Sequence, residues 1–122
     1  MVRYCQLIRL LPEHREVYIR YHAEVWPGVL ATIERCNIRN YSIFLHDELL
    51  IAYLEYHGSD FEADMKRMAA DSETQRWWAL MDPMQQPLPE ATATHRWVQV
   101  PEVFHFDGSP FPALANLSGD MQ

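Results

Sequence analysis

The clearest strand pattern in this chain of 122 residues lies in residues 40–56, NYSIFLHDELLIAYLEY. Two runs rich in β-branched and aromatic residues, 40–45 and 49–56, flank the polar triplet His46-Asp47-Glu48, and this pattern predicts a β-hairpin. The second run is apolar at every position from Leu49 to Leu54, so both of its faces are expected to be covered. Helices on one face of the sheet would leave the other face in need of a partner.

The residues before the hairpin predict one strand and two helices. Residues 3–10 have a strand-like pattern, and Pro12 suits the first turn of a helix that reaches about Glu24. Trp26 precedes Pro27, and a residue before proline is pushed out of the helical region. The first helix is therefore expected to end there, with a second helix beginning at Pro27.

The residues after the hairpin predict two more helices and a last strand. Ser59 and Glu62 have the spacing of a capping box, which begins the third helix. Residues 71–81 open with the start signal Asp-Ser and form the fourth helix. A long proline-containing loop follows, and the last strand is predicted near residues 102–106, with Pro101 marking its start or an edge.

The resulting order, β-αα-β-β-αα-β, predicts an α+β fold of the ferredoxin-like kind, with a four-stranded antiparallel sheet. A symmetric homodimer with facing sheets, a dimeric α/β barrel, is the simplest way to cover the open sheet face. We expect residues 1–107 to form the single domain and residues 108–122 to form a C-terminal tail.

Composition excludes several classes of partner. The chain has 17 acidic and 10 basic residues, a net charge of −7 and a single lysine, Lys66. Binding to nucleic acid or to an anionic membrane requires clustered basic residues, so neither is an expected partner. Cys5 and Cys36 are expected to be free thiols. No apolar run resembles a signal peptide or a membrane span, so the expected compartment is the cytoplasm.

Metal and nucleotide chemistry find no support in the sequence. The six histidines show no spacing typical of a metal site. The chain also lacks a phosphate-binding loop, a nucleophile elbow and a dinucleotide fingerprint, and it contains only four glycines. A metal site and nucleotide or nicotinamide chemistry are therefore not expected.

Tyr18, His22 and Trp26 are spaced four residues apart on and just beyond the first predicted helix. Such residues share one helix face, where an imidazole can exchange protons near neutral pH and aromatic rings can pack against a sugar. An amphipathic helix with core aromatics and a histidine bonded to a backbone carbonyl explains the same spacing. Spacing alone favours this second interpretation.

Three further aromatic residues are candidates for a binding site. Trp77 and Trp78 are neighbours on a helix and point about 100° apart, so one can lie in the core while the other lines a pocket. Tyr41 lies in the first strand of the hairpin and can present its hydroxyl to a ligand. A strand aromatic is most often a packing residue.

These motifs together resemble the L-rhamnose mutarotase family over about residues 1–107, in the same order and spacing. The stretches that carry the resemblance are Tyr18-(x)3-His22-(x)3-Trp26-Pro27, Asn40-Tyr41-Ser42-Ile43-Phe44-Leu45, Gln75-Arg76-Trp77-Trp78 and Glu102-Val103-Phe104-His105.

The resemblance implies an enzyme that interconverts the α and β anomers of a 6-deoxy-L-sugar without a metal or an organic cofactor. It implies that His22 is the catalytic proton donor and that four aromatic residues bind the substrate, with Trp26 as a further pocket wall. These four are Tyr18, Tyr41, Trp77 and Trp78. The expected partners are a monosaccharide and a second copy of the chain.

Three positions depart from the family pattern. Gly28 stands where an acidic residue is usual, and Tyr21 stands where a basic residue often precedes the histidine. Residues 84–89, MQQPLP, differ from the Asn-Pro-Asp loop of rhamnose enzymes and are similar to a branch associated with L-fucose. L-Rhamnose is the expected sugar, with L-fucose as the alternative.

Two other classes of protein share this predicted scaffold. Dimeric ferredoxin-like barrels include cofactor-free monooxygenases and haem-binding enzymes, and an apolar pocket with a single histidine would suit either. The second class is a non-catalytic sugar-binding or regulatory dimer in which His22 only forms a hydrogen bond to the ligand.

Overall fold

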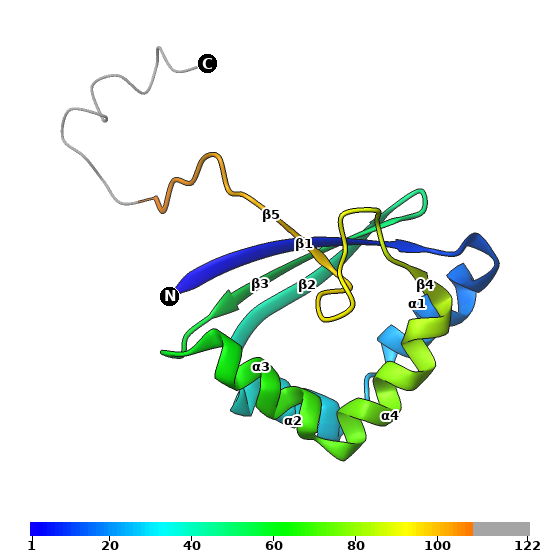
Figure 1. The fold of residues 1–122 in the computed structure, drawn as a ribbon, viewed down its shortest axis with the longest axis horizontal. Helices are drawn as coiled ribbons and strands as arrows, with labels where there is room; N and C mark the ends of the chain where they lie inside the picture. Colours follow the sequence, from blue (N-terminus) through cyan, green and yellow to red (C-terminus); the bar gives the residue numbers. More distant parts are fainter. Residues whose placement is uncertain (109–122) are drawn as a thin grey trace, which may run out of the picture.

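The predicted hairpin forms one edge and the next strand of the sheet in a computed structural model that describes residues 1–108 (Figure 1). Its strands are β2 (Ile38–His46) and β3 (Leu49–Tyr56), which pair in antiparallel fashion. Asp47 turns the chain between them with a φ angle of 52°. The hairpin prediction is confirmed.

The sheet is antiparallel and has the strand order β2-β3-β1-β4. β1 (Val2–Leu10) pairs with β3 along nearly its whole length. The other side of β1 pairs with two short strands, β4 (Gln85–Gln86) near one end and β5 (Val98–Val100) in the middle. The fourth position in the sheet is thus filled by two short strands along one line, separated by residues 87–97.

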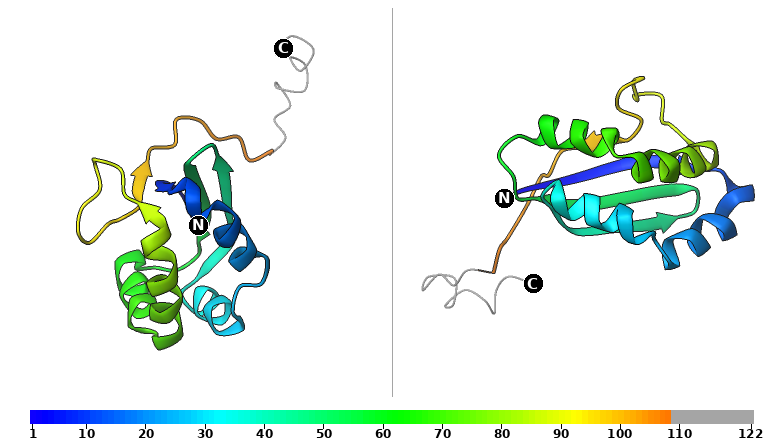
Figure 2. Two further views of the ribbon diagram at one scale, coloured as in Figure 1. Left: turned by 90° about the vertical axis from the view of Figure 1, so that its right-hand side faces the viewer. Right: turned by 90° about the horizontal axis from the view of Figure 1, so that it is seen from below.

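All four helices lie on the same side of the sheet (Figures 1 and 2). The first crossover contains the 3-10 turn η1 (Pro12–His14), α1 (Arg15–Ala23) and α2 (Pro27–Arg35). The second contains α3 (Phe61–Ala70), α4 (Ser72–Met81) and the 3-10 turn η2 (Asp82–Met84). This arrangement confirms the predicted α+β fold with two helices in each crossover.

The helix starts agree with the sequence in two of three cases. Trp26 has a ψ angle of 134° and its carbonyl accepts the amides of Val29 and Leu30, so α2 begins at the proline as predicted. The Asp71 carboxylate accepts the Thr74 amide and begins α4. The capping box predicted for α3 is wrong, because the carboxylate of Asp60, rather than the Ser59 hydroxyl, accepts an amide of the first turn.

The strand predicted at residues 102–106 is also wrong. The alternating residues that pair with β1 are those of β5, and Pro101 follows immediately. Proline has no amide hydrogen for the ladder, so it ends the strand. Residues 101–108 contain no regular element and leave the sheet on the side away from the helices (Figure 2). Of the predicted tail, residues 109–122 lie outside the described residues.

The core lies between the helices and the inner face of the sheet. Its larger cluster combines buried residues of every layer: Ile8, Leu10, Tyr18, Val29, Leu50, Trp77, Met81 and Met84. A second cluster around Cys36, Ile38 and Tyr56 fills the other end. Both cysteines are free thiols, as expected. Across residues 1–108, no helix is long and apolar enough to cross a membrane, and the cytoplasmic location stays a prediction.

The larger cluster should contribute much of the stability of the fold. Ile8 is completely buried in the central strand, so Ile8→Ala is expected to lower the free energy of unfolding by about 2–5 kcal/mol, as large-to-small core changes do. Leu30 is 52% exposed on α2, and Leu30→Ala should change it by less than about 0.5 kcal/mol. Urea denaturation at one protein concentration measures both, and equal effects would contradict this core assignment.

Candidate active site

α1 brings Tyr18 and His22 together one helical turn apart. Their rings stack with centroids 4.3 Å apart and an interplanar angle of 28°. Tyr18 is buried, 4% exposed, whereas His22 is only partly buried. The shared helix face predicted from the spacing therefore exists, with the tyrosine on its inner side.

The His22 ring is held by a hydrogen bond to its own helix. Nδ1 lies 2.8 Å from the Tyr18 carbonyl oxygen. A carbonyl can only accept, so Nδ1 carries the hydrogen and Nε2 is the basic nitrogen of the neutral ring. Burial lowers the pKa of His22, against the opposing effect of this hydrogen bond. Near pH 7 the ring is therefore neutral and can accept a proton at Nε2.

Trp77 forms the aromatic centre of the site. It is 5% exposed and meets three rings edge to face. The centroid distances are 5.4 Å to His22, 5.2 Å to Trp26 and 5.9 Å to Tyr21. Tyr21, which departs from the family pattern, thus serves as a packing partner of this tryptophan. The contact with Trp77 restricts the orientation of the imidazole plane in addition to the backbone hydrogen bond.

A cleft of about 350 Å³ opens beside His22, between α1 and the β2–β3 hairpin. None of the described side chains that line it carries a permanent charge. The lining residues are Tyr18, Ile19, His22, Ala23, Ile43, Phe44, Leu45 and Leu50. A cleft of this volume with one imidazole and one phenol suits a small uncharged molecule.

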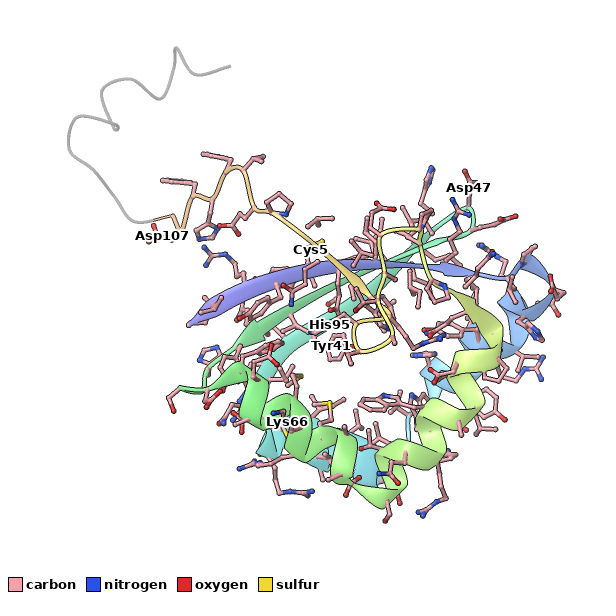
Figure 3. The ribbon with its side chains drawn as sticks, viewed as in Figure 1. Cys5, Tyr41, Asp47, Lys66, His95 and Asp107 are labelled. Carbon is pink, nitrogen blue, oxygen red and sulfur yellow. The ribbon has the colours of Figure 1, made fainter. Side chains whose placement is uncertain are left out.

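Tyr41 faces the helix side of the sheet because of a β-bulge in residues 39–42, where Asn40 has a φ angle of 48° (Figure 3). Ile38 and Ile43 both face the helices although they are five residues apart, which strict alternation forbids. The extra residue restores the inward face at Tyr41. Although 38% of this residue is exposed, burial of its phenol, with a contribution from nearby Tyr18, raises the pKa of Tyr41 to about 12.

Trp26 and Trp78, both predicted as site residues, differ in their contacts with the aromatic group around Trp77. Trp26 contacts Trp77 and lies behind the cleft rather than on its wall. Trp78 is 38% exposed and has no ring contact with the aromatic group among the described residues. The expectation that one of the two tryptophans is core is met by Trp77.

Sequence reasoning missed Gln85. This residue is 9% exposed, and its Nε2 donates a hydrogen bond of 3.1 Å to the Tyr18 hydroxyl. A glutamine in a loop-like, proline-rich stretch carries no periodic signal. Its position in β4, beside the end of β1, is created only by the sheet pairing.

Gly28 departs from the family pattern for a visible reason. A Cβ atom at this position would overlap the carboxylate of Glu73, which comes from the first turn of α4. The negative charge near the start of α2 is therefore supplied by a different helix, where it is favoured by the helix dipole. The Glu73 carboxylate is the end of a flexible side chain, so a larger residue at position 28 would displace this carboxylate rather than α4.

Within residues 1–108, no group of three or more His, Cys, Asp or Glu side chains is placed to hold a metal ion. The aromatic group contains an imidazole with one open nitrogen, two protonated phenols and Trp77, and of these only Tyr18 and His22 line the cleft. Fold and site together suit a small α+β enzyme that carries out acid–base chemistry on an uncharged polar substrate.

The chain belongs to the L-rhamnose mutarotase family, because the sequence model of that family matches residues 3–106. Its activity is of the isomerase type, the interconversion of sugar anomers. This membership favours the mutarotase among the classes that the sequence left open.

Curated relatives cover nearly the whole domain. The chain is 29% identical over 103 residues to the L-rhamnose mutarotase of Oceanobacillus iheyensis, covering 83% of this chain and 94% of the relative. It is 32% identical over 109 residues to that of Lactiplantibacillus plantarum, covering 88% and 100%. It is also 30% identical over 110 residues to the L-fucose mutarotase of Xanthomonas campestris pv. campestris, covering 85% and 87%.

Two solved structures share the fold. L-Rhamnose mutarotase from Formosa agariphila superposes with a TM-score of 0.70 at 20% identity, covering 88% of this chain and all of that one. Tetracenomycin F2 cyclase from Streptomyces glaucescens gives a TM-score of 0.64 at 15% identity, with coverages of 90% and 100%. The second likeness illustrates that one scaffold serves different chemistries.

The environment of His22 predicts its titration. Because burial lowers its pKa from the ordinary value of 6.5, the imidazole should stay neutral on acidification until below pH 6.5. NMR titration of ring nitrogens, with His22→Ala used to assign the signal, measures this midpoint and should place the hydrogen on Nδ1. A midpoint at or above 6.5, or a hydrogen on Nε2 of the neutral ring, would contradict the described geometry.

Proposed function

We propose that this protein interconverts the α and β anomers of L-rhamnose, with His22 as the acid–base group. The observation that carries the proposal is the 2.8 Å hydrogen bond from His22 Nδ1 to the Tyr18 carbonyl oxygen. It fixes the tautomer in which Nε2 is basic, and His22 lines the 350 Å³ cleft.

Anomer exchange needs one proton moved from the anomeric hydroxyl to the ring oxygen. The neutral Nε2 of His22 accepts the anomeric proton while the bond between C1 and the ring oxygen breaks. The imidazolium so formed is the proton donor for the ring oxygen, which leaves an open-chain aldehyde and a neutral imidazole. Rotation about C1–C2 and the reverse steps give the other anomer. Acid–base assistance of this kind supplies about 10²–10⁴-fold.

The aromatic residues are proposed to bind the sugar. Burial raises the pKa of both Tyr18 and Tyr41, so the two phenols stay protonated and form hydrogen bonds to sugar oxygens. Trp77 packs edge to face against the imidazole of His22, and Trp26 packs in the same way against Trp77. Trp78, which has no ring contact with this group among the described residues, is proposed to contact the sugar from its partly exposed position.

L-Rhamnose is favoured over L-fucose by the relatives. The family description and the relatives in Oceanobacillus and Lactiplantibacillus are L-rhamnose mutarotases. The Xanthomonas relative, an L-fucose mutarotase with similar identity, makes L-fucose the second candidate. The two sugars differ only in the configuration at C2 and C4, so the same acid–base chemistry serves both.

Anomeric exchange is measured directly by saturation-transfer NMR with L-rhamnose and L-fucose in parallel. Exchange above the buffer rate is expected for both sugars or for rhamnose alone. His22→Ala should lower the rate at least about 10²-fold, because the proton shuttle is removed. His46→Ala is the matched control, since that side chain is 80% exposed in the hairpin turn, and it should keep full activity.

Two results would overturn the proposal. If neither sugar exchanges faster than in buffer, the protein is not a mutarotase for these sugars. If folded His22→Ala keeps full activity, the acid–base role belongs to another group.

We also propose that two copies associate through the outer faces of their sheets. The strand register places an apolar row across the face that the helices leave open, from Phe44 through Ile51 and Leu7 to Val98. Phe44 is 59% exposed in the single chain. Contiguous apolar surface of this kind is typical of association sites.

A charge in the middle of this row should break the dimer. Sedimentation of the native protein is expected to give twice the 14.4 kDa chain mass, and Ile51→Lys should give the single-chain mass. Leu30→Lys, on the helix side, is the control and should stay dimeric. A native protein that sediments as a monomer, or an Ile51→Lys variant that stays dimeric, would contradict association through this face.

A further inference from the structure

Gln85 is an unusual residue for its surroundings. Gln85 is buried and pairs with Leu10 in the sheet. Both Leu10 and the preceding residue, Met84, belong to the larger core cluster. A buried amide without hydrogen bonds is costly, and an apolar residue would fill the same space. The only hydrogen bond that its side chain makes among the described residues is the 3.1 Å bond from Nε2 to the Tyr18 hydroxyl. Packing therefore does not explain why position 85 is a glutamine, but its hydrogen bond to the Tyr18 hydroxyl does.

The hydrogen bond determines what the Tyr18 hydroxyl can do. The phenol oxygen accepts from Gln85, and its own hydrogen has no acceptor among the described residues. Burial raises the pKa of Tyr18, and the Gln85 bond opposes this rise only in part, so the hydroxyl keeps its hydrogen. The hydroxyl hydrogen is left for a ligand, because Tyr18 also lines the cleft.

We propose that Gln85 is a positioning residue that determines sugar specificity by fixing the Tyr18 hydroxyl as a hydrogen-bond donor in one direction. This inference rests on the proposed mutarotase function and deepens it. A donor with a fixed direction meets a sugar hydroxyl of one configuration and misses the other. A site built to form a hydrogen bond to a substrate hydroxyl discriminates strongly against a ligand that cannot form it.

The second polar atom of the amide takes no part in the contact with Tyr18. Gln85 Oε1 forms no hydrogen bond with the described residues. This oxygen is not fully buried. Gln85 is not among the residues that line the cleft, whereas Tyr18 is, so Gln85 acts on a ligand through the Tyr18 hydroxyl.

The test replaces Gln85 by methionine, which has a similar length and volume and no amide hydrogen. Gln85→Met should lower kcat/KM for the preferred sugar about threefold to tenfold, the value of one hydrogen bond, and bring the rhamnose-to-fucose ratio closer to one. Gln86→Met is the control: it is the next residue of β4 and exposed, so neither kcat/KM nor the ratio should change. An unchanged ratio in folded Gln85→Met would overturn the proposal.

A double-mutant cycle separates positioning from general loss of packing. If Gln85 acts through Tyr18, Gln85→Met should cause no further loss of kcat/KM in a Tyr18→Phe background. Independent, additive losses would overturn the proposal. A native protein that exchanges neither sugar would instead defeat the proposed function, so the two failures are distinguishable.

A spectroscopic readout does not depend on activity. The Tyr18 ring carbon that bears the hydroxyl can be labelled with carbon-13 and titrated with alkali. Loss of the Gln85 donor should move the Tyr18 midpoint upward in Gln85→Met and leave it unchanged in Gln86→Met. A midpoint that does not move in folded Gln85→Met would overturn the proposal.

Discussion

The bond from His22 Nδ1 to the Tyr18 carbonyl oxygen is the constraint from which the properties of the site follow. It joins a side chain to the backbone of its own helix one turn earlier, so no other element is needed to bring its two atoms together. Because it uses Nδ1, it exposes Nε2, and because it is short it orients the ring. Trp77 then meets that ring at its edge and prevents the imidazole from turning away.

The same constraint explains why a core interpretation and a catalytic interpretation were both reasonable for this helix. Tyr18 is a core residue by burial, and His22 has the backbone partner that a structural histidine would have. Neither fact removes the second nitrogen from the cleft. A histidine that is satisfied on one side and open on the other is structurally anchored and chemically available.

Sequence patterns predicted those parts of the fold and site that depend on local spacing. The hairpin, the α2 start at Pro27 and the shared face of Tyr18 and His22 follow from residues within one or two turns of each other. The inward direction of Tyr41 depends on a bulge, and a bulge reverses an alternation without changing composition. Gln85 reaches the site through a strand pair of only two residues, which leaves no periodic signal.

The net charge of the chain does not predict the charge of its cleft. The chain carries a net charge of −7, yet none of the described residues that line the cleft beside His22 is permanently charged. Burial acts on each titratable group there in the direction that preserves its neutral form: it lowers the pKa of His22 and raises that of Tyr18 and of Tyr41. A neutral imidazole beside neutral phenols has donors and acceptors but no net charge. On the proposed function, such a site holds an uncharged sugar by the direction of its hydrogen bonds, and the placement of each hydroxyl hydrogen then determines which sugar is bound.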